Sequence, residues 1–337
     1  MTLDRCLPID MTTLTPFRLR PWFRPMVWGV RDLAPWYDYK ISDQPIGEVW
    51  LSGNDCVVDT GPPAGKTLDA LFHERREDLL GESGAHQERF PLLMKVLFPR
   101  EKLSVQVHPG DEMARQHGEP HGKTECWYVL EADPGAAVAL GLRPGTSLPD
   151  VKAAIENKTL ENLLQSVPVK KDEMIFVDAG TVHAIFPGVV MLETQQNSDM
   201  TYRLYDYGRP RELHLKDGLQ AIRLATEAGP VPPKIETTSG SQSVAGGREI
   251  IVQSKYFRVD RTRLAEANMT ENFSLPNGKK SNRVQLVFVG AGAGQLQSSG
   301  QAPIRLQRGE LAVVPACKPD WSFTSTAPTE ILRAIPE

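Results

Sequence analysis

Short runs in which hydrophobic and polar positions alternate, or in which β-branched and aromatic residues cluster, recur along most of the chain. Clear examples are the segments IGEVWL, LSVQVH, ECWYVLE, MIFVDAG and ELAVVPA. Turn residues separate the runs at intervals of roughly 8–12 residues, a spacing typical of β-sandwiches and barrels. Glycine and proline number 27 each, and such frequent turn residues also favour short strands. The pattern therefore predicts a mainly β protein.

Three segments break the strand pattern with the 3.6-residue spacing of an amphipathic helix. They are residues 67–80, 147–167 and 212–226. In the second segment, Ser147 is placed to cap the first turn, where Pro149 is tolerated. We expect these helices to decorate the first part of the fold.

The length of 337 residues suits two domains. Residues 227–247 are rich in proline, glycine, serine and threonine and nearly lack large apolar side chains, which is typical of a linker. We therefore expect one domain at residues 1–226 and a second, β-rich domain at residues 248–337. All seven histidines precede the linker, so a histidine site can lie only in the first domain.

The strand LSVQVH has a polar face. If residues 103–108 are extended, Ser104, Gln106 and His108 point to one side and the apolar residues to the other. An exposed sheet face would explain this strand by itself. The segment GKTECWYVL, however, also presents Lys123 and Glu125 side by side on one face.

A later segment, MIFVDAGTVHAI, delivers His183 just after a glycine turn. Two imidazoles, a carboxylate and an amide oxygen from three strands can converge on one divalent ion inside a barrel. Zinc accepts such nitrogen and oxygen donors at about 2.0–2.2 Å. The sequence therefore predicts one zinc site, made by Gln106, His108, Glu125 and His183.

Other motifs are weaker candidates for a site. His117, His121 and Glu125 follow helical spacing, but the glycines and proline of HGEPHG forbid a helix there. The remaining histidines suit solvated or structural positions: His73, His86 and His214. The segment VFVGAGAGQ is similar to a dinucleotide-binding loop, yet no helix can follow it, so a hairpin is expected. The segment GELAVVPACKPDW has the form of a metal-barrel motif without histidine, so we expect no metal in the second domain.

Composition narrows the class of protein. The net charge of −4 argues against nucleic acids or anionic membranes as main partners, because both attract a clustered positive field. No segment approaches the roughly 18 uninterrupted apolar residues of a membrane span. The four cysteines include no C-x-x-C pair, which suits a reducing compartment. We expect a cytoplasmic protein.

Five motifs occur in a fixed order: LSVQVHPGDE, GKTECWYVLEADPGA, GTVHAI, LETQQNSD and TYRLYDYGR. Together they resemble the type I mannose-6-phosphate isomerases of the cupin superfamily, from residue 27 to about residue 219. The resemblance implies two cupin-type jelly-roll barrels, the first catalytic and the second degenerate and metal-free. By motif, the family's zinc ligands fall on Gln106, His108, Glu125 and His183, the four that strand alternation selects.

The implied reaction is a zinc-dependent interconversion of mannose 6-phosphate and fructose 6-phosphate through a cis-enediol, with one zinc per chain. The family's catalytic arginine falls on Arg203, and Asp199 lies four residues before it. The resemblance also implies that Lys123 is the family's lysine two residues before the ligand glutamate. It places Lys95 and Ser104 near the sugar phosphate. The proton-shuttling base stays open between Lys123, a metal-bound hydroxide and a carboxylate.

The sequence departs from the family pattern at two turns. Gly110 stands where relatives usually have aspartate, and Asp178 stands where cupins usually have proline. Both lie beside predicted ligands and could alter turn geometry, but neither removes a ligand.

Alternative functions and structural explanations stay open. An iron cupin oxygenase would use His108, Glu125 and His183 as a facial triad, and a non-catalytic cupin would bind a sugar phosphate without turnover. Metal analysis with an oxygen-uptake assay would separate the first alternative. Lys123 could also be a simple ion-pair partner of Glu125, Arg203 a structural link to acidic neighbours such as Asp199, and Lys95 an edge residue. The only partner expected is a small phosphorylated sugar, with the chain a monomer or weak homodimer.

Overall fold

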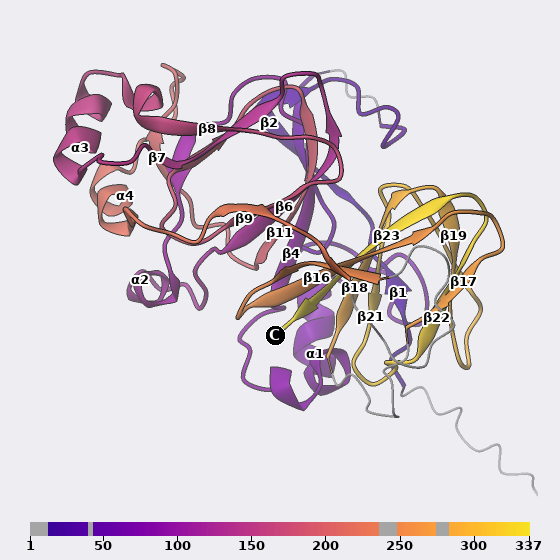
Figure 1. The fold of residues 1–337 in the computed structure, drawn as a ribbon. Coiled ribbons are helices and arrows are strands. Elements are labelled where there is room, and N and C mark those ends of the chain that lie inside the picture. The colour runs from indigo at the N-terminus through magenta and orange to yellow at the C-terminus, as the bar shows by residue number, and fades with distance from the viewer. Residues whose placement is uncertain (1–12, 40–42, 236–247, 274–282) are drawn as a thin grey trace, which may run out of the picture.

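The computed structural model describes residues 13–39, 43–235, 248–273 and 283–337. Within these ranges the chain forms four antiparallel sheets and a few short helices, which confirms the mainly β prediction. Figure 1 shows two lobes, with the yellow C-terminal strands in one and the magenta helical segments at the far end of the other.

A seven-stranded sheet forms the centre of the N-terminal half. In pairing order its strands are β13 (Gly229–Val231), β9 (Met174–Val177), β6 (Glu125–Ala132), β11 (Val189–Gln196), β4 (Leu92–Leu97), β3 (Ile46–Trp50) and β2 (Trp22–Val30). Strand β11 lies between β6 and β4, so segments far apart in the sequence become neighbours.

A five-stranded sheet faces the first one. Its order is β12 (Tyr202–Tyr205), β5 (Val105–Val107), β10 (His183–Ile185), β7 (Ala137–Leu142) and β8 (Leu164–Pro168). Side chains from both sheets, such as Val129, Ile175, Val138 and Ile185, pack into one buried cluster between them. The candidate residues of the sequence therefore lie on sheets that enclose a common interior.

The C-terminal half contributes two further sheets. One has the order β1 (Phe17–Arg18), β21 (Leu311–Val314), β18 (Gln285–Ala291), β23 (Thr329–Pro336), β16 (Phe257–Leu264), β15 (Arg248–Gln253) and β14 (Lys234–Ile235). The other has the order β17 (Thr270–Asn272), β22 (Trp321–Ser325), β19 (Ala293–Ser298) and β20 (Ile304–Gln307). The N-terminal strand β1 thus pairs within a sheet of the C-terminal half.

The helices are short. They are α1 (Leu68–Leu80), α2 (Asp111–Gln116), α3 (Leu148–Glu156) and α4 (Leu215–Ala221), with 3₁₀ turns η1 (Glu82–Gly84) and η2 (Leu160–Leu163). Helices α3 and α4 pack against the five-stranded sheet and lie at the end of the molecule away from the C-terminal strands (Figure 1). None of the helices in the described part of the chain combines the length and apolar character needed to cross a bilayer.

The three predicted helices exist, but two are shorter than expected. Ser147 caps α3 through a reciprocal capping box with Asp150, as the sequence predicts. The helix nevertheless ends at Glu156, and the left-handed backbone of Lys158 separates it from the following turn. Leu164 then enters β8 and pairs with β7, because ladder hydrogen bonds outweigh a continued helical pattern. Helix α2, which the sequence analysis did not predict, precedes the HGEPHG loop of residues 117–122.

One of the hydrophobic clusters spans both halves of the molecule. Cys126, Tyr128 and Leu130 of β6 pack with Phe257 and Phe288 of the C-terminal half, whereas alternate residues of β6 face the interior between the first two sheets. Strand β6 is therefore buried on both faces, and its position depends on both halves.

The segment expected as a linker is partly paired. Strand β13 joins the seven-stranded sheet of the N-terminal half, and β14 joins β15 of the C-terminal half. Residues 236–247 lie outside the described residues. The division into domains at 227–247 stays a prediction.

Candidate metal centre and active site

Three side chains of metal-binding type meet between the two N-terminal sheets. His108 directly follows β5, Glu125 opens β6, and His183 opens β10. Their ligand atoms lie within 4.8 Å of one another, and all three side chains are buried. Gln106 is the cross-strand partner of His183, so both side chains lie on one face of that sheet. The fold thus brings together the four residues that strand alternation selects.

Backbone contacts orient both imidazoles. Nδ1 of His108 lies 3.0 Å from the carbonyl oxygen of Met200, and Nδ1 of His183 lies 2.9 Å from that of Thr181. Because a carbonyl can only accept, each Nδ1 carries the proton and each Nε2 keeps a lone pair. Both Nε2 atoms lie 3.5 Å from the Glu125 carboxylate, one opposite each oxygen.

Burial keeps the histidines neutral. It lowers the pKa of His183 to about 4 and that of His108 well below its ordinary value, and the nearby Lys123 ammonium lowers both further. Burial and the neighbouring Glu193 raise the pKa of Glu125 to about 7, against the opposing charge of Lys123. A metal ligand requires neutral imidazole, and this site supplies it without protonation at neutral pH.

The residues present fit a divalent cation. Two Nε2 lone pairs and a carboxylate converge, and the buried Oε2 of Glu125 accepts no hydrogen bond although Lys123 forms an ion pair with it. Gln106 lies beside this group: its Oε1 accepts a hydrogen bond from Ser104 at 3.2 Å, and its Nε2 lies 3.2 Å from Nε2 of His183. A rotation of the Gln106 amide would exchange its oxygen and nitrogen. Such nitrogen and oxygen donors suit zinc.

Two lysines and a second carboxylate lie beside the metal group. Nζ of Lys123 lies 2.9 Å from Glu125 and 3.1 Å from Nε2 of His108. Nζ of Lys95 lies 3.0 Å from Glu193 and 3.6 Å from Glu48. Burial alone would raise the pKa of Glu193, but Lys95 and Lys123 together hold it at about 2.

Glu193 is a residue that the sequence analysis missed. It is buried on β11, directly opposite Lys95 on one side and Trp127 on the other. The signal was present in the run VVMLE, where a single carboxylate ends an apolar stretch. An acidic residue in a two-sided buried strand needs a cationic partner, because an unpaired buried charge is costly.

Arg203 lies opposite Gln106 in the pairing of β12 with β5. Its Nη1 donates to the carbonyl of Glu212 at 2.8 Å, while its Nε is buried without a hydrogen-bond partner. Partial burial lowers the pKa of Arg203, as do the nearby guanidinium groups of Arg211 and Arg209. Asp199 is exposed, and its negative charge contributes to the raised pKa of Lys95. Nε of Arg203 is therefore an unused hydrogen-bond donor on β12, the strand that pairs with β5.

A group of arginines surrounds Asp206 near Arg203. Arg211 donates to both oxygens of this buried carboxylate at 2.6 Å, and Arg209 donates to it at 3.1 Å. Arg209 also donates to the carbonyl of Lys102, two residues before Ser104. We call Arg203, Arg209 and Arg211 the arginine cluster. Glu101 also lies 3.8 Å from Arg209, so the cluster is partly neutralised, and Nε of Arg203 is its donor without a hydrogen-bond partner.

The turn after His108 is fixed by a close backbone approach. A Cβ on Gly122 would lie 2.6 Å from the carbonyl carbon of Gly110, so only glycine fits. Asp111 accepts hydrogen bonds from the Gly122 backbone and Gln196, both at 2.9 Å, and from Tyr256 of the C-terminal half at 2.7 Å. At Gly110 itself there is open space for a side chain. The departure at Gly110 leaves this turn intact.

The other expected features lie outside the metal group. Asp178 forms an ion pair with Arg223 at 3.0 Å. His117 ends α2, and His214 accepts a hydrogen bond from the backbone of Arg203. Within the described residues, a single group of three or more histidine, cysteine or acidic side chains has metal-binding geometry.

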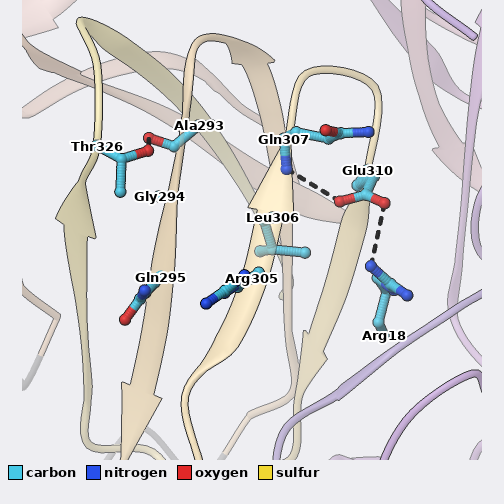
Figure 2. A pocket seen from close by; sticks show the side chains of 9 residues that line it. All are labelled: Arg18, Ala293, Gly294, Gln295, Arg305, Leu306, Gln307, Glu310 and Thr326. Atoms are coloured by element: carbon cyan, nitrogen blue, oxygen red, sulfur yellow. Dashed lines mark hydrogen bonds and ion pairs between the residues drawn. The ribbon is translucent and has the colours of Figure 1, made fainter.

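A cavity of about 460 Å³ lies in the C-terminal half, away from these residues. Figure 2 shows Gln295, Arg305 and Gln307 on neighbouring strands, with Glu310 bound to Arg18 at one side. Arg18 and Glu310 are 3.1 Å apart. The cavity contains no histidine and contributes nothing to the metal group.

Two histidines and a carboxylate that converge between paired antiparallel sheets are typical of a cupin-type fold. A model of the family "Phosphomannose isomerase type I, catalytic domain" matches residues 16–142. The mannose-6-phosphate isomerase ManA of Bacillus subtilis is 35% identical, over 90% of this chain and 94% of that protein. The mannose-6-phosphate isomerase of Streptococcus mutans is 32% identical, over 91% of this chain and 95% of that protein.

A solved structure agrees with the sequence relatives. The crystal structure of mannose 6-phosphate isomerase from Bacillus subtilis has a TM-score of 0.82 and 30% identity, and the match covers 95% of this chain and 99% of that chain. This chain belongs to the type I phosphomannose isomerase family, which is a family of isomerases.

Proposed function

We propose that this protein is a zinc-dependent aldose–ketose isomerase that interconverts mannose 6-phosphate and fructose 6-phosphate through a cis-enediol. The observation that carries the proposal is the buried group of His108, Glu125 and His183, with Arg203 on an adjacent strand. The family membership of the chain supports the choice of substrate.

The reaction moves a carbonyl between C1 and C2, so a proton leaves one carbon and returns to the other while negative charge develops on the sugar oxygens. A zinc ion held by Gln106, His108, Glu125 and His183 would act as a Lewis acid toward these oxygens. Arg203 adds a permanent positive charge directly across the strand pairing from Gln106, where it would stabilise the developing oxyanion.

We assign proton donation to a sugar oxygen to Lys123, because an ammonium group that is paired with Glu125 can donate a proton but cannot accept one. Its Nζ lies 3.1 Å from His108 Nε2 and 2.9 Å from Glu125, so a substrate oxygen or carbon that reaches the ligands also reaches this nitrogen. Glu193 is 3.9 Å from the same nitrogen and keeps Lys123 in place. Glu193 is the carboxylate candidate for the base that takes the proton from carbon.

The phosphate would position C1 and C2 from a distance. Lys95 and Ser104 are our first candidates, with Asp199 near the sugar, and Ser104 lies on the ligand side of its strand. Lys95 is fully buried and engaged by two carboxylates, whereas Arg209 of the arginine cluster is bound to the backbone two residues before Ser104. Comparing Lys95→Ala with Arg209→Ala decides between them. The variant that removes the phosphate-binding side chain loses affinity for mannose 6-phosphate much more than for mannose.

The test of the proposal is a coupled assay of fructose 6-phosphate formation from mannose 6-phosphate, before and after chelation. Chelation should abolish turnover, and zinc should restore it. Glu125→Ala should leave a folded protein with little metal and activity lowered by at least about 10³-fold, since a Lewis acid supplies several kcal/mol. Stoichiometric zinc retained by this variant would overturn the ligand assignment. Oxygen uptake without isomerisation would favour the oxygenase alternative, and sugar binding without turnover the non-catalytic one.

We also propose that the protein acts in the cytoplasm as a monomer or weak homodimer, with no nucleic-acid or membrane partner. Cys56, Cys126 and Cys317 are free thiols, which supports a reducing environment. Light scattering of the purified protein at several concentrations tests the oligomeric state.

A further inference from the structure

Trp127 is fully buried on β6, two residues after Glu125 and on the same face of the strand. Its indole Nε1 lies 3.1 Å from Oε1 of Glu125 and 3.1 Å from Oε2 of Glu193. Trp127 and Glu193 are also direct cross-strand partners on β6 and β11. One N–H group is thus shared by two buried carboxylates.

The indole and Lys123 divide the two oxygens of Glu125 between them. Oε1 receives the indole hydrogen bond and faces His183 at 3.5 Å, while Oε2 pairs with Lys123 and faces His108 at 3.5 Å. With only the ammonium contact, the carboxylate could rotate about its last bond. The second contact fixes the plane of the carboxylate, so that each oxygen stays opposite one imidazole.

Trp127 also contacts the ring of His183. The two ring centroids are 5.4 Å apart, with an edge-on interplanar angle of 62°. The indole therefore touches two of the three residues whose ligand atoms converge. It also lies against Glu193, whose negative charge repels Glu125, and its N–H dipole offsets part of this repulsion.

We propose that Trp127 is a positioning residue that pre-orients Glu125 and His183 for the metal ion; the inference rests on the zinc site of the proposed function. Partners of metal ligands that act in this way typically change metal affinity or activity by about 10–100-fold when they are lost. The resemblance and the strand pattern assign no role to this residue.

The experiment compares Trp127→Phe with the matched control Trp36→Phe in the full-length chain. Trp36 is also buried and donates its indole N–H to a glutamate, Glu131, at 2.8 Å, but it lies outside the metal group. The readouts are the zinc dissociation constant, from competition with a chelating dye, and the melting temperature of the metal-free protein. Trp127→Phe should weaken zinc binding by about 10–100-fold. Trp36→Phe should leave it within about twofold.

Replacement of Trp127 by benzothienylalanine, which keeps the ring shape but has sulfur in place of N–H, covers the case in which phenylalanine disrupts packing. Zinc affinity in this variant that matches the wild type would overturn the role of the N–H group. Equal weakening in the Trp127 and Trp36 variants would show a general stability effect and also overturn it. If the wild-type chain itself binds no zinc, the proposed function fails first, and this outcome is distinct from both.

Discussion

The two halves of the molecule each bury a cluster of charged residues, and the clusters differ in how donors and acceptors are matched. In the C-terminal half, Arg333 donates hydrogen bonds of 2.6–3.2 Å to both carboxylate oxygens of Asp260. It also donates to Gln285 at 3.0 Å. Trp321 donates its indole N–H to the same Gln285 at 3.1 Å. In the N-terminal half, two Nε2 lone pairs and a carboxylate point at one another.

The matching of donors to acceptors distinguishes a structural ion pair from a candidate metal-binding site. Asp260 and Arg333 are fully paired across β16 and β23, so no strong acceptor is left for a ligand. His108, Glu125 and His183 place three ligand atoms within 4.8 Å of one another, and Oε2 of Glu125 accepts no hydrogen bond, so a cation can bind among them. Burial of charge alone therefore does not mark function; convergence of lone pairs does.

The largest expected effect breaks the structural pair. Asp260→Ala leaves the Arg333 guanidinium buried without its partner, which should cost about 3–5 kcal/mol in the free energy of unfolding. Urea unfolding of the metal-free protein measures this loss. The zinc dissociation constant of the folded variant should stay within about twofold of the wild type. A large drop in zinc affinity without unfolding would contradict the separation of the two clusters.

The next effect concerns turnover. Arg203→Ala should lower kcat and kcat/KM together by about 10²–10³-fold, because the lost interaction forms as charge develops. Arg203→Lys keeps the charge without the planar fork and should recover part of the loss. Steady-state kinetics with mannose 6-phosphate provide the measurement. Normal kcat with a raised KM would move Arg203 to ground-state or phosphate binding.

The acceptor-rich cluster should also make stability depend on pH. The pKa of His183 is about 4 in the folded protein, below its ordinary value of 6.5. Between these values the unfolded chain binds a proton here that the folded chain does not, so the free energy of unfolding falls as the pH falls. Relative to His183→Gln, the metal-free wild type should lose up to about 1.4 kcal/mol more per pH unit. Equal slopes in urea unfolding at pH 6.5, 5.5 and 4.5 would remove this explanation.

The smallest effect tests the contact between the halves at the site. Tyr256→Phe removes one hydrogen bond to Asp111 and should cost about 1 kcal/mol of stability, with turnover changed little. The control Lys318→Ala should change neither quantity. A strong loss of kcat in folded Lys318→Ala would show that the C-terminal half takes part in the chemistry.

Much of the site follows from the alternation of side chains along single strands. That alternation places Gln106 with His108, and Lys123 with Glu125, because neighbours within a strand are visible in the sequence. Glu193 escapes such reasoning, since its partners Lys95 and Trp127 belong to strands on either side of β11. Strand order is set by tertiary packing, so a partner on the next strand cannot be identified from one chain's pattern.

The same limit explains the errors at element ends. The apolar stripe of residues 147–167 predicts one helix, but its last residues form β8, whose partner β7 lies earlier in the chain. The capping residue Ser147 could be predicted because its hydrogen bond is local. The arginine cluster lies in a segment with a recognised motif, yet the gathering of Arg209 and Arg211 around Asp206 becomes visible only in three dimensions.

The double burial of β6 has a consequence for how the chain can be divided. Its outer face, with Cys126, Tyr128 and Leu130, is covered by the C-terminal half. A chain shortened to residues 1–226 would expose this face together with the face of β11 that carries Leu192. The two faces would form a contiguous hydrophobic surface that is prone to self-association. Strand β1 would likewise lose β21, its only strand partner among the described residues. The N-terminal half therefore cannot be excised as a well-behaved independent module, even though all of the proposed metal ligands lie within it.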